Sequence, residues 1–225
     1  MQRSACKVKP PTVFVVENDA SVRDGLAFLL EGAGFAVQTF EKAESFLAAC
    51  GADQPGCLIL DVRLPGMSGL MLHEQLESVG VVLPVIVITG YASVDTAVRV
   101  LKRGAIDFIE KPFSDEVILE RVREAMLLDA ERRRRAALRQ QLSARLDRLT
   151  ARERQVFEEV VHGKANKVVA YEFGISEKTV EAHRARVMQK LGAASLAELV
   201  RMDLVFHQAD RHHWSVRPML FDTWS

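Results

Sequence analysis

Three short apolar runs in the chain each end on a residue that can do chemistry. One run ends at Asp61, the next at Thr89, and the third at Lys111. Short runs rich in Val and Ile, with helical stretches between them, are typical of buried parallel strands. Ligands of such sheets bind beyond the carboxyl ends of the strands. If the three runs are neighbouring strands, a carboxylate, a hydroxyl and an ammonium group meet at one edge, and that set suits the handling of a phosphoryl group.

An acidic turn, Glu17-Asn18-Asp19, follows the first apolar run of the chain. A carboxylate that takes up a phosphoryl group needs a cation to neutralise the crowded negative charge. Oxygen ligands favour Mg²⁺ over a softer metal. Asp61 alone could equally be a structural cap of its strand, so the inference depends on the acidic turn, Thr89 and Lys111 occurring together.

The first half of the chain alternates strand and helix signals, which predicts an α/β doubly wound domain with a five-stranded parallel sheet and right-handed crossovers. The expected strands are 12–16, 35–40, the run that ends at Asp61, 84–88 and 106–110. The expected helices are 20–32, 43–49, a loop and helix over 66–79, 94–102, and one that begins near Ser114.

The second half is charged and helical. Residues 127–147 include the run Glu131-Arg-Arg-Arg-Arg135, which indicates a helical linker with a solvated face; a weak DNA-backbone or dimer contact is the alternative. Thr150, followed three residues later by Glu153, is a capping-box start for the first of four helical segments, 151–162, 166–173, 177–190 and 195–206. Two short helices joined by a tight turn at Gly174 match a helix-turn-helix in a small all-α domain.

The formal net charge of zero hides an asymmetry. Residues 1–125 hold 12 Lys/Arg against 17 Asp/Glu, and residues 126–225 hold 18 against 13. An acidic half joined to a basic half indicates two domains, of which the second faces a polyanion. The sequence has neither an apolar stretch of membrane-spanning length nor a secretory signal, and its three cysteines have no metal-ligand spacing. We therefore expect a cytoplasmic protein with no membrane partner.

Two segments resemble known families. Residues 12–125, above all the stretch from Gly90 to Phe113, resemble the receiver domain of FixJ-like two-component response regulators, and 149–202 resemble the LuxR/FixJ-type DNA-binding domain, above all 174–191. The resemblance implies a flavodoxin-like receiver with strand order 2-1-3-4-5 and a four-helix helix-turn-helix domain. The domains implied are a receiver at 10–126, a helical linker at 127–147, the DNA-binding domain at 148–206 and a C-terminal extension at 207–225.

The resemblance also implies roles for the residues at the strand ends. Asp61 would accept phosphate from a phosphohistidine on a sensor histidine kinase. Thr89 would move toward the phosphoryl group, Lys111 would pair with it, and before phosphorylation Lys111 would pair with Asp61. Phe108 takes the place of the aromatic switch residue that turns inward when Thr89 moves. The Lys111–Pro112 peptide bond is expected to be cis.

The implied Mg²⁺ pocket consists of Glu17, Asn18, Asp61 and the backbone carbonyl of Arg63. The chain departs from the family here, because the family places a second carboxylate where Asn18 stands. An amide oxygen can ligate a metal but carries no charge, so we expect a lower Mg²⁺ affinity. The functional consequence is either slower phosphorylation or partial activity without phosphate.

The segment 177–190 has the layout of a recognition helix. Val180, Val187 and Leu191 fall on one side and are expected to pack inward. Residues expected to face base edges in the major groove are Lys178, Glu181, Ala182 and Ala185. Residues better placed for phosphate contacts are Lys167, Thr179, Arg184, Arg186 and Lys190. The alternative is a small helical bundle that binds another protein.

We therefore expect a response regulator that is not an enzyme. Phosphorylated on Asp61 by a sensor histidine kinase with Mg²⁺, it would dimerise through the receiver, bind double-stranded DNA and activate transcription with RNA polymerase. A haloacid dehalogenase-type phosphatase would need a second Asp where Arg63 stands, and a flavin-binding domain would not place Glu17 and Asp19 beside a phosphate. A phosphorylation-independent DNA-binding regulator remains open because of Asn18.

Overall fold

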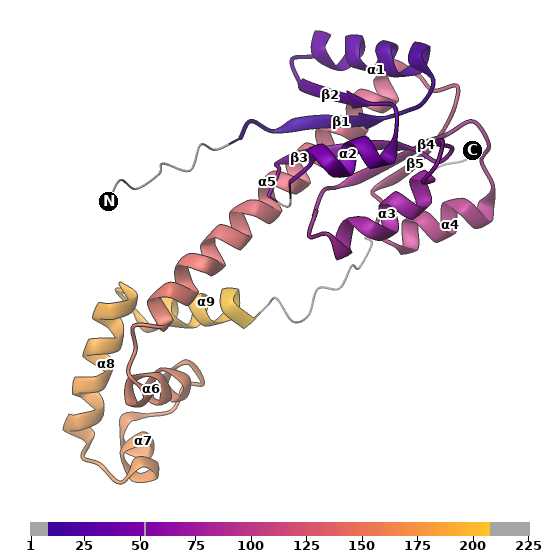
Figure 1. Cartoon of the computed structure of the whole chain (residues 1–225). Helices are drawn as coiled ribbons and strands as arrows, with labels where there is room; N and C mark the ends of the chain where they lie inside the picture. Colours follow the sequence, from indigo (N-terminus) through magenta and orange to yellow (C-terminus); the bar gives the residue numbers. More distant parts are fainter. Residues whose placement is uncertain (1–8, 52, 208–225) are drawn as a thin grey trace, which may run out of the picture. The chain divides into compact units, whose positions relative to one another are not determined.

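The computed structural model describes residues 9–51 and 53–207 (Figure 1). The chain divides into two compact units, residues 1–133 and 134–225, and each unit is described by itself. Cys6 and the C-terminal residues that include His212, His213, Trp214 and Trp224 lie outside the described residues, so the expected C-terminal extension is not described beyond His207. No described helix is both long and apolar enough to cross a membrane.

The first unit contains a five-stranded parallel sheet in the order β2-β1-β3-β4-β5, which confirms the predicted fold and topology. Three of these strands, β1, β3 and β4, are fully buried and together rich in Val and Ile, as expected of strands covered on both faces. The strands are β1 (Thr12–Val16), β2 (Ala36–Phe40), β3 (Gly56–Asp61), β4 (Val85–Thr89) and β5 (Asp107–Glu110).

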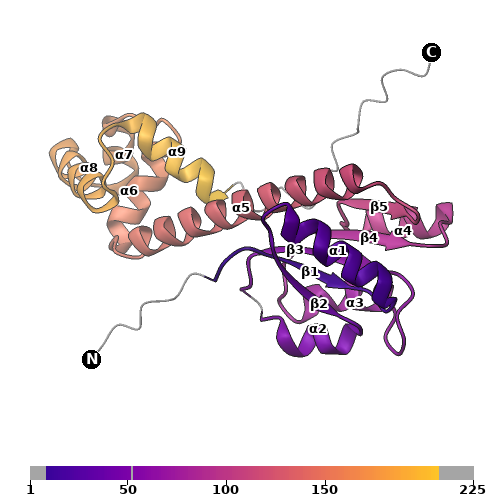
Figure 2. The same ribbon diagram turned by 90° about the horizontal axis from the view of Figure 1, so that it is seen from above.

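Helices cover both faces of this sheet (Figures 1 and 2). One face packs against α1 (Ala20–Gly32) and the first part of α5 (Asp115–Leu146). The other face packs against α2 (Ala43–Ala49), α3 (Gly69–Ser78) and α4 (Val94–Lys102). Cys57 is fully buried in the α1/α5 core, and burial raises the pKa of its thiol to about 12.

The helix α5 is continuous from Asp115 to Leu146 and includes nearly all of residues 127–147, which the sequence predicts to be a helical linker. Within the first unit, Arg133 anchors the helix to the segment before β3. Its guanidinium donates to the carboxylates of Asp129 and Asp53, at 2.8 Å each, and to the backbone carbonyl of Gln54. Arg133, one arginine of the run 132–135, therefore makes contacts within the first unit, whereas the sequence indicated a solvated face.

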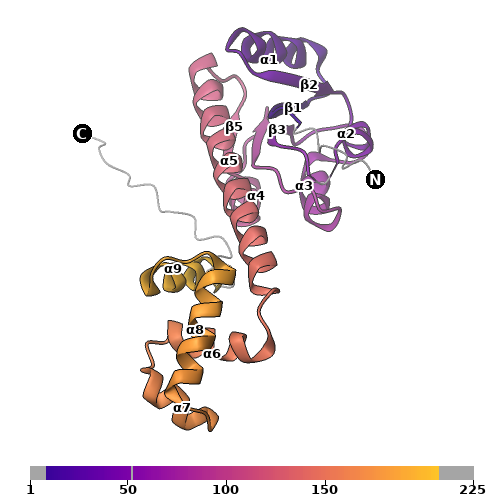
Figure 3. The same ribbon diagram turned by 90° about the vertical axis from the view of Figure 1, so that its left-hand side faces the viewer.

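The second unit contains α6 (Ala151–Val161), α7 (Asn166–Phe173), α8 (Glu177–Leu191) and α9 (Leu196–His207) (Figure 3). The helix α8 packs on α6 and α7, and α9 packs on α6. The predicted capping box between Thr150 and Glu153 is present. Gly174 ends α7 at φ 64°, a left-handed conformation that glycine adopts readily, and thereby allows the tight turn into α8.

Candidate functional site

The three functional groups predicted at the strand ends lie on adjacent strands. Asp61 is the last residue of β3 and is paired with Ile88, the residue before Thr89 in β4. Thr89 is in turn paired with Glu110 at the end of β5, and its carbonyl accepts from the backbone N–H of Lys111 at 2.7 Å. Parallel pairing thus brings Asp61, Thr89 and Lys111 to one edge of the sheet.

Lys111 is shared by two buried carboxylates. Its Nζ lies 2.5 Å from Oε2 of Glu17 and 3.2 Å from Oδ1 of Asp61. The side chains of Glu17 and Asp61 are 1% and 5% exposed, against 19% for Lys111. Two acids therefore depend on one ammonium group, which is closer to Glu17 than to Asp61.

The electrostatics of Asp61 follow from this arrangement. Burial and the nearby Glu17 carboxylate raise its pKa above the usual value, and they outweigh Lys111 and the hydrogen bond from the backbone N–H of Arg63. The charged form of Asp61 is therefore poorly compensated. A cation bound beside Asp61 would compensate this charge.

Gly69, at the start of α3, lets the chain pass close to the Asp61 backbone. A Cβ atom at Gly69 would lie 1.9 Å from the carbonyl oxygen of Asp61, and no side chain fits in that space. The N–H of Gly69 instead donates to the carbonyl of Val62 at 3.1 Å. This close approach fixes the turn that follows Asp61.

Thr89 is 1% exposed, and its hydroxyl is engaged by its own loop. The hydroxyl oxygen accepts from the backbone N–H of Tyr91 at 3.2 Å and lies 3.5 Å from the Tyr91 carbonyl. Phe108 is half-buried against the α2/α3/α4 core. The peptide bond between Lys111 and Pro112 is cis, as the family resemblance implies.

The acidic turn contributes one buried carboxylate to the site. Oε1 of Glu17 accepts from the N–H of Asp19 at 3.0 Å, whereas Asn18 is exposed. Asp19 caps α1: its Oδ1 accepts from the N–H and the hydroxyl of Ser21, at 2.8 and 2.7 Å, and these bonds lower its pKa. The two buried carboxylates are hard oxygen donors and fit Mg²⁺, but the described residues contain no group of three His, Cys, Asp or Glu side chains that could hold a metal.

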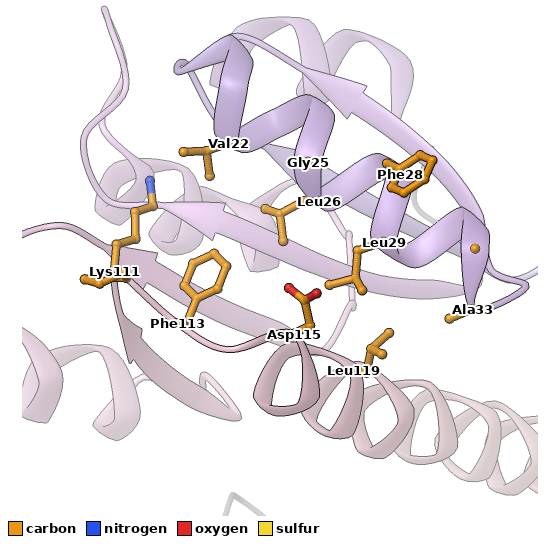
Figure 4. A pocket seen from close by; sticks show the side chains of 12 residues that line it. Val22, Gly25, Leu26, Phe28, Leu29, Ala33, Lys111, Phe113, Asp115 and Leu119 are labelled. Carbon is orange, nitrogen blue, oxygen red and sulfur yellow. The ribbon is translucent and has the colours of Figure 1, made fainter.

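An apolar groove lies next to this edge, between α1 and the start of α5 (Figure 4). Its volume is about 1010 Å³, and Lys111 is among its lining residues. Phe28 of α1 also lines the groove and is 82% exposed. The groove therefore reaches Lys111, the residue that pairs with Asp61 and Glu17.

In the second unit, α8 has the two faces that the sequence predicts. Val180, Val187 and Leu191 are buried in the core of the unit. The residues predicted to face base edges are all exposed, namely Lys178, Glu181, Ala182 and Ala185. Lys167, Thr179 and Arg186, predicted to contact phosphates, are exposed as well.

Two of the predicted phosphate-contacting residues have partners inside the unit. Lys190 donates to the Glu153 carboxylate at 2.6 Å and to the Arg148 carbonyl at 3.1 Å. Arg184 donates to the side-chain oxygen of Asn166 at 2.6 Å. The charge of Lys190 is therefore partly compensated within the fold, while Arg184 is held in place by α7.

Comparison with known proteins identifies both units. Residues 13–123 match the response regulator receiver domain, and 147–203 match the LuxR family of bacterial regulatory proteins. The chain is 48% identical to the transcriptional regulatory protein FixJ of Azorhizobium caulinodans, over 86% of this chain and 92% of that protein. It belongs to the FixJ-like response regulators. A FixJ of Rhizobium meliloti is 47% identical, over 86% of this chain and 95% of that protein.

Solved structures agree with this assignment. The response regulator StyR is 45% identical, with a TM-score of 0.76 over 86% of this chain and 98% of that one. This response regulator is therefore a two-component transcriptional regulator with a LuxR-type DNA-binding domain, and it is not an enzyme.

Sequence reasoning missed two features of this response regulator's receiver. It paired Lys111 with Asp61 alone, whereas Glu17 is the nearer partner. It also gave Tyr91 no role, although the Arg63 guanidinium lies 3.6 Å from the centroid of the Tyr91 ring. A signal for the second feature exists in the sequence, because Arg63 and Tyr91 each stand two residues after a functional residue at a strand end.

Proposed function

We propose that Asp61 is the phosphoacceptor and that phosphorylation controls dimerisation and DNA binding. The observation that carries this proposal is the shared Lys111: a buried carboxylate with a raised pKa lies 3.2 Å from an ammonium group that it shares with Glu17. A carboxylate oxygen of Asp61 attacks the phosphorus of a phosphohistidine. A P–O bond forms, the P–N bond breaks, and the imidazole leaves with the bond's electron pair and takes up a proton.

Each residue of the site has a defined part in this step. Lys111 remains close to Glu17 and supplies positive charge to the phosphoryl oxygens. The Thr89 hydroxyl donates a hydrogen bond to the phosphoryl group. The Phe108 side chain turns inward when Thr89 moves, and this shifts the receiver toward its active form. Glu17, Asn18, Asp61 and the Arg63 carbonyl are the residues that would hold Mg²⁺, which neutralises the charge of the incoming phosphoryl group when bound.

The partner that donates the phosphoryl group is a sensor histidine kinase. Its phosphohistidine has to reach Asp61, so the kinase must cover the surface beside the site. The groove between α1 and α5 has a volume of about 1010 Å³, is mainly apolar and contains Lys111 (Figure 4). Phe28→Ala is expected to slow transfer from a kinase more than transfer from acetyl phosphate.

The phosphorylated protein binds double-stranded DNA in the cytoplasm, with α8 in the major groove. It acts there with RNA polymerase, and the expected effect is activation of transcription. Dimerisation of the phosphorylated protein pairs two DNA-binding domains, and the pair has a higher sequence specificity than one domain alone. The exposed Lys178, Glu181, Ala182 and Ala185 face the bases. Lys167, Thr179, Arg184 and Arg186 contact phosphates, and Lys190 contributes less because Glu153 holds it.

The test is incubation with acetyl phosphate over a range of Mg²⁺ concentrations, followed by intact mass, sizing and DNA binding. Wild type is expected to gain one phosphoryl group, dimerise and bind DNA more tightly, and Asp61→Asn is expected to do none of these. If wild type gains neither mass, dimer nor affinity, the phosphorylation mechanism is wrong and the phosphorylation-independent regulator becomes the better account.

The effect of Asn18 has its own comparison. Asn18→Asp is expected to lower the Mg²⁺ concentration needed for half-maximal phosphorylation, because it adds a charged oxygen ligand. Asp19→Asn is the matched control, since Asn also caps helices well and Asp19 is committed to α1. An unchanged Mg²⁺ requirement in Asn18→Asp would remove Asn18 from the metal site.

A further inference from the structure

Two loops flank Asp61, and one contact joins them. Arg63 lies in the loop after β3, and Tyr91 lies in the loop after β4. The guanidinium carbon of Arg63 is 3.6 Å from the centroid of the Tyr91 ring, which is a close cation–π stack. Both residues are exposed, and Tyr91 is 68% exposed, so the stack is not imposed by burial in a core.

The same tyrosine holds the hydroxyl of Thr89. The N–H of Tyr91 donates to Oγ1 of Thr89 at 3.2 Å, and the same oxygen lies 3.5 Å from the Tyr91 carbonyl. Such a local turn is a common arrangement for a Thr that begins a loop. The hydroxyl of Thr89 is thus committed to its own loop in this state.

Arg63 is connected to both sides of the site. Its backbone N–H donates to the Asp61 carboxylate, and its side chain stacks on Tyr91. The chain of contacts therefore runs from Asp61 through Arg63 and Tyr91 to Thr89. Only the side-chain stack can be removed without altering the backbone groups at either end.

We propose that the Arg63–Tyr91 stack is a clasp that holds Thr89 in its resting orientation and so sets how readily the receiver switches. This inference rests on the proposed phosphorylation of Asp61. For its hydroxyl to reach a phosphoryl group on Asp61, Thr89 must give up its bonds to Tyr91 or carry Tyr91 with it. Either movement strains or breaks the stack, so the stack stabilises the resting state and not the active one. Arg63 and Tyr91 act through Thr89 and are positioning residues.

The expected effect is a shift of the switching equilibrium. An exposed cation–π contact corresponds to a population change of about two- to fivefold. Without the clasp, less ligand at Asp61 is needed to convert the receiver. The two side chains form one contact, so removing both should change the equilibrium no more than removing either.

The experiment titrates full-length protein with beryllofluoride and excess Mg²⁺, and follows dimer formation by sizing. Arg63→Gln and Tyr91→Leu are each expected to lower the half-maximal beryllofluoride concentration about two- to fivefold, and the double variant is expected to match the single ones. Tyr91→Phe keeps the ring and is expected to behave as wild type. A merely structural role would lower the thermal stability of Arg63→Gln without changing its midpoint of conversion.

The outcomes separate this inference from the function on which it rests. If wild type does not respond to beryllofluoride at all, the proposed phosphorylation of Asp61 fails, and the clasp fails with it. If wild type responds and Arg63→Gln and Tyr91→Leu have the wild-type midpoint, the clasp alone is wrong. Additive effects of the two substitutions would also contradict the clasp, because they would show two independent contacts.

Discussion

Each unit has a buried carboxylate beside a lysine, Asp61 in the first unit and Glu153 in the second, and the pKa values of these two acids are shifted in opposite directions. As whole residues, Asp61 and Glu153 are both 3% exposed. Lys190 lies 2.6 Å from Glu153, and together with the N–H of Thr150 it lowers the pKa of that acid to about 2. Lys111 lies 3.2 Å from Asp61 and is nearer to Glu17, and the pKa of Asp61 is raised. Two acids with the same exposed fraction therefore have pKa values that are shifted in opposite directions.

Burial is the largest cause of the raised pKa of Asp61, and the nearby Glu17 carboxylate is the second. Glu153 has a lysine and a capping interaction to itself. Asp61 shares Lys111 with Glu17, so the lysine does not offset the rise that burial causes in the pKa of Asp61. A buried acid whose charge is poorly compensated is stabilised by any change that adds a cation or removes its repulsion with a neighbouring acid. Binding of Mg²⁺ beside Asp61 would be such a change.

The largest expected effect comes from removing the shared lysine. Lys111→Met leaves Glu17 and Asp61 buried without a cation, and we expect a loss of about 3 kcal/mol in unfolding free energy at neutral pH. The loss should shrink on acidification, because protonation of either acid removes the repulsion. Lys190→Met is the matched control: Glu153 keeps its bond to the Thr150 N–H, so its loss should be smaller. Chemical denaturation of the full chain measures both, and equal losses would contradict the comparison.

Neutralising Asp61 should have a smaller effect of the opposite sign. Because its pKa is raised in the folded state, ionised Asp61 costs stability above that pKa, and the cost disappears as the pH falls toward the unfolded value. Asp61→Asn is therefore expected to raise the unfolding free energy by roughly 1 kcal/mol at neutral pH.

Asp129 is the control for that prediction. It is 4% exposed, but it accepts from the Gly56 N–H at 2.9 Å and from Arg133 at 2.8 Å. Asp129→Asn should destabilise the receiver by about 1–3 kcal/mol, because it weakens a satisfied buried ion pair. If Asp61→Asn lowers the unfolding free energy as Asp129→Asn does, Asp61 is a structural acid.

The effect of pH on the Glu153 ion pair is expected only in acid solution. Its folded pKa lies near 2, below the ordinary value of 4.5, so its stabilisation is complete above about pH 4.5 and is lost as the pH falls toward 2. The difference in stability between wild type and Glu153→Gln should follow that window. Calorimetry of the full chain at stepwise lower pH measures it, and a difference that does not change with pH would remove the ion pair as its cause.

The sequence predicts the fold and the meeting of Asp61, Thr89 and Lys111 because strand order and strand ends follow from apolar periodicity and family resemblance. It does not predict the side-chain partners. Glu17 lies nearer to Lys111 than Asp61 does, and Lys190 turns inward to Glu153, because both choices depend on three-dimensional packing. The same holds for α5: helical periodicity continues across residues 127–147, but the partners of Arg133 lie far away in the sequence.

The identity of the phosphorylated residue tests the central claim most directly. After incubation with acetyl phosphate and Mg²⁺, borohydride reduction converts an aspartyl phosphate to homoserine, which peptide mass spectrometry locates. The account predicts homoserine at position 61 in wild type and none in Asp61→Asn. Reduction at another acid, or at no residue in a protein that still dimerises and binds DNA, would contradict it.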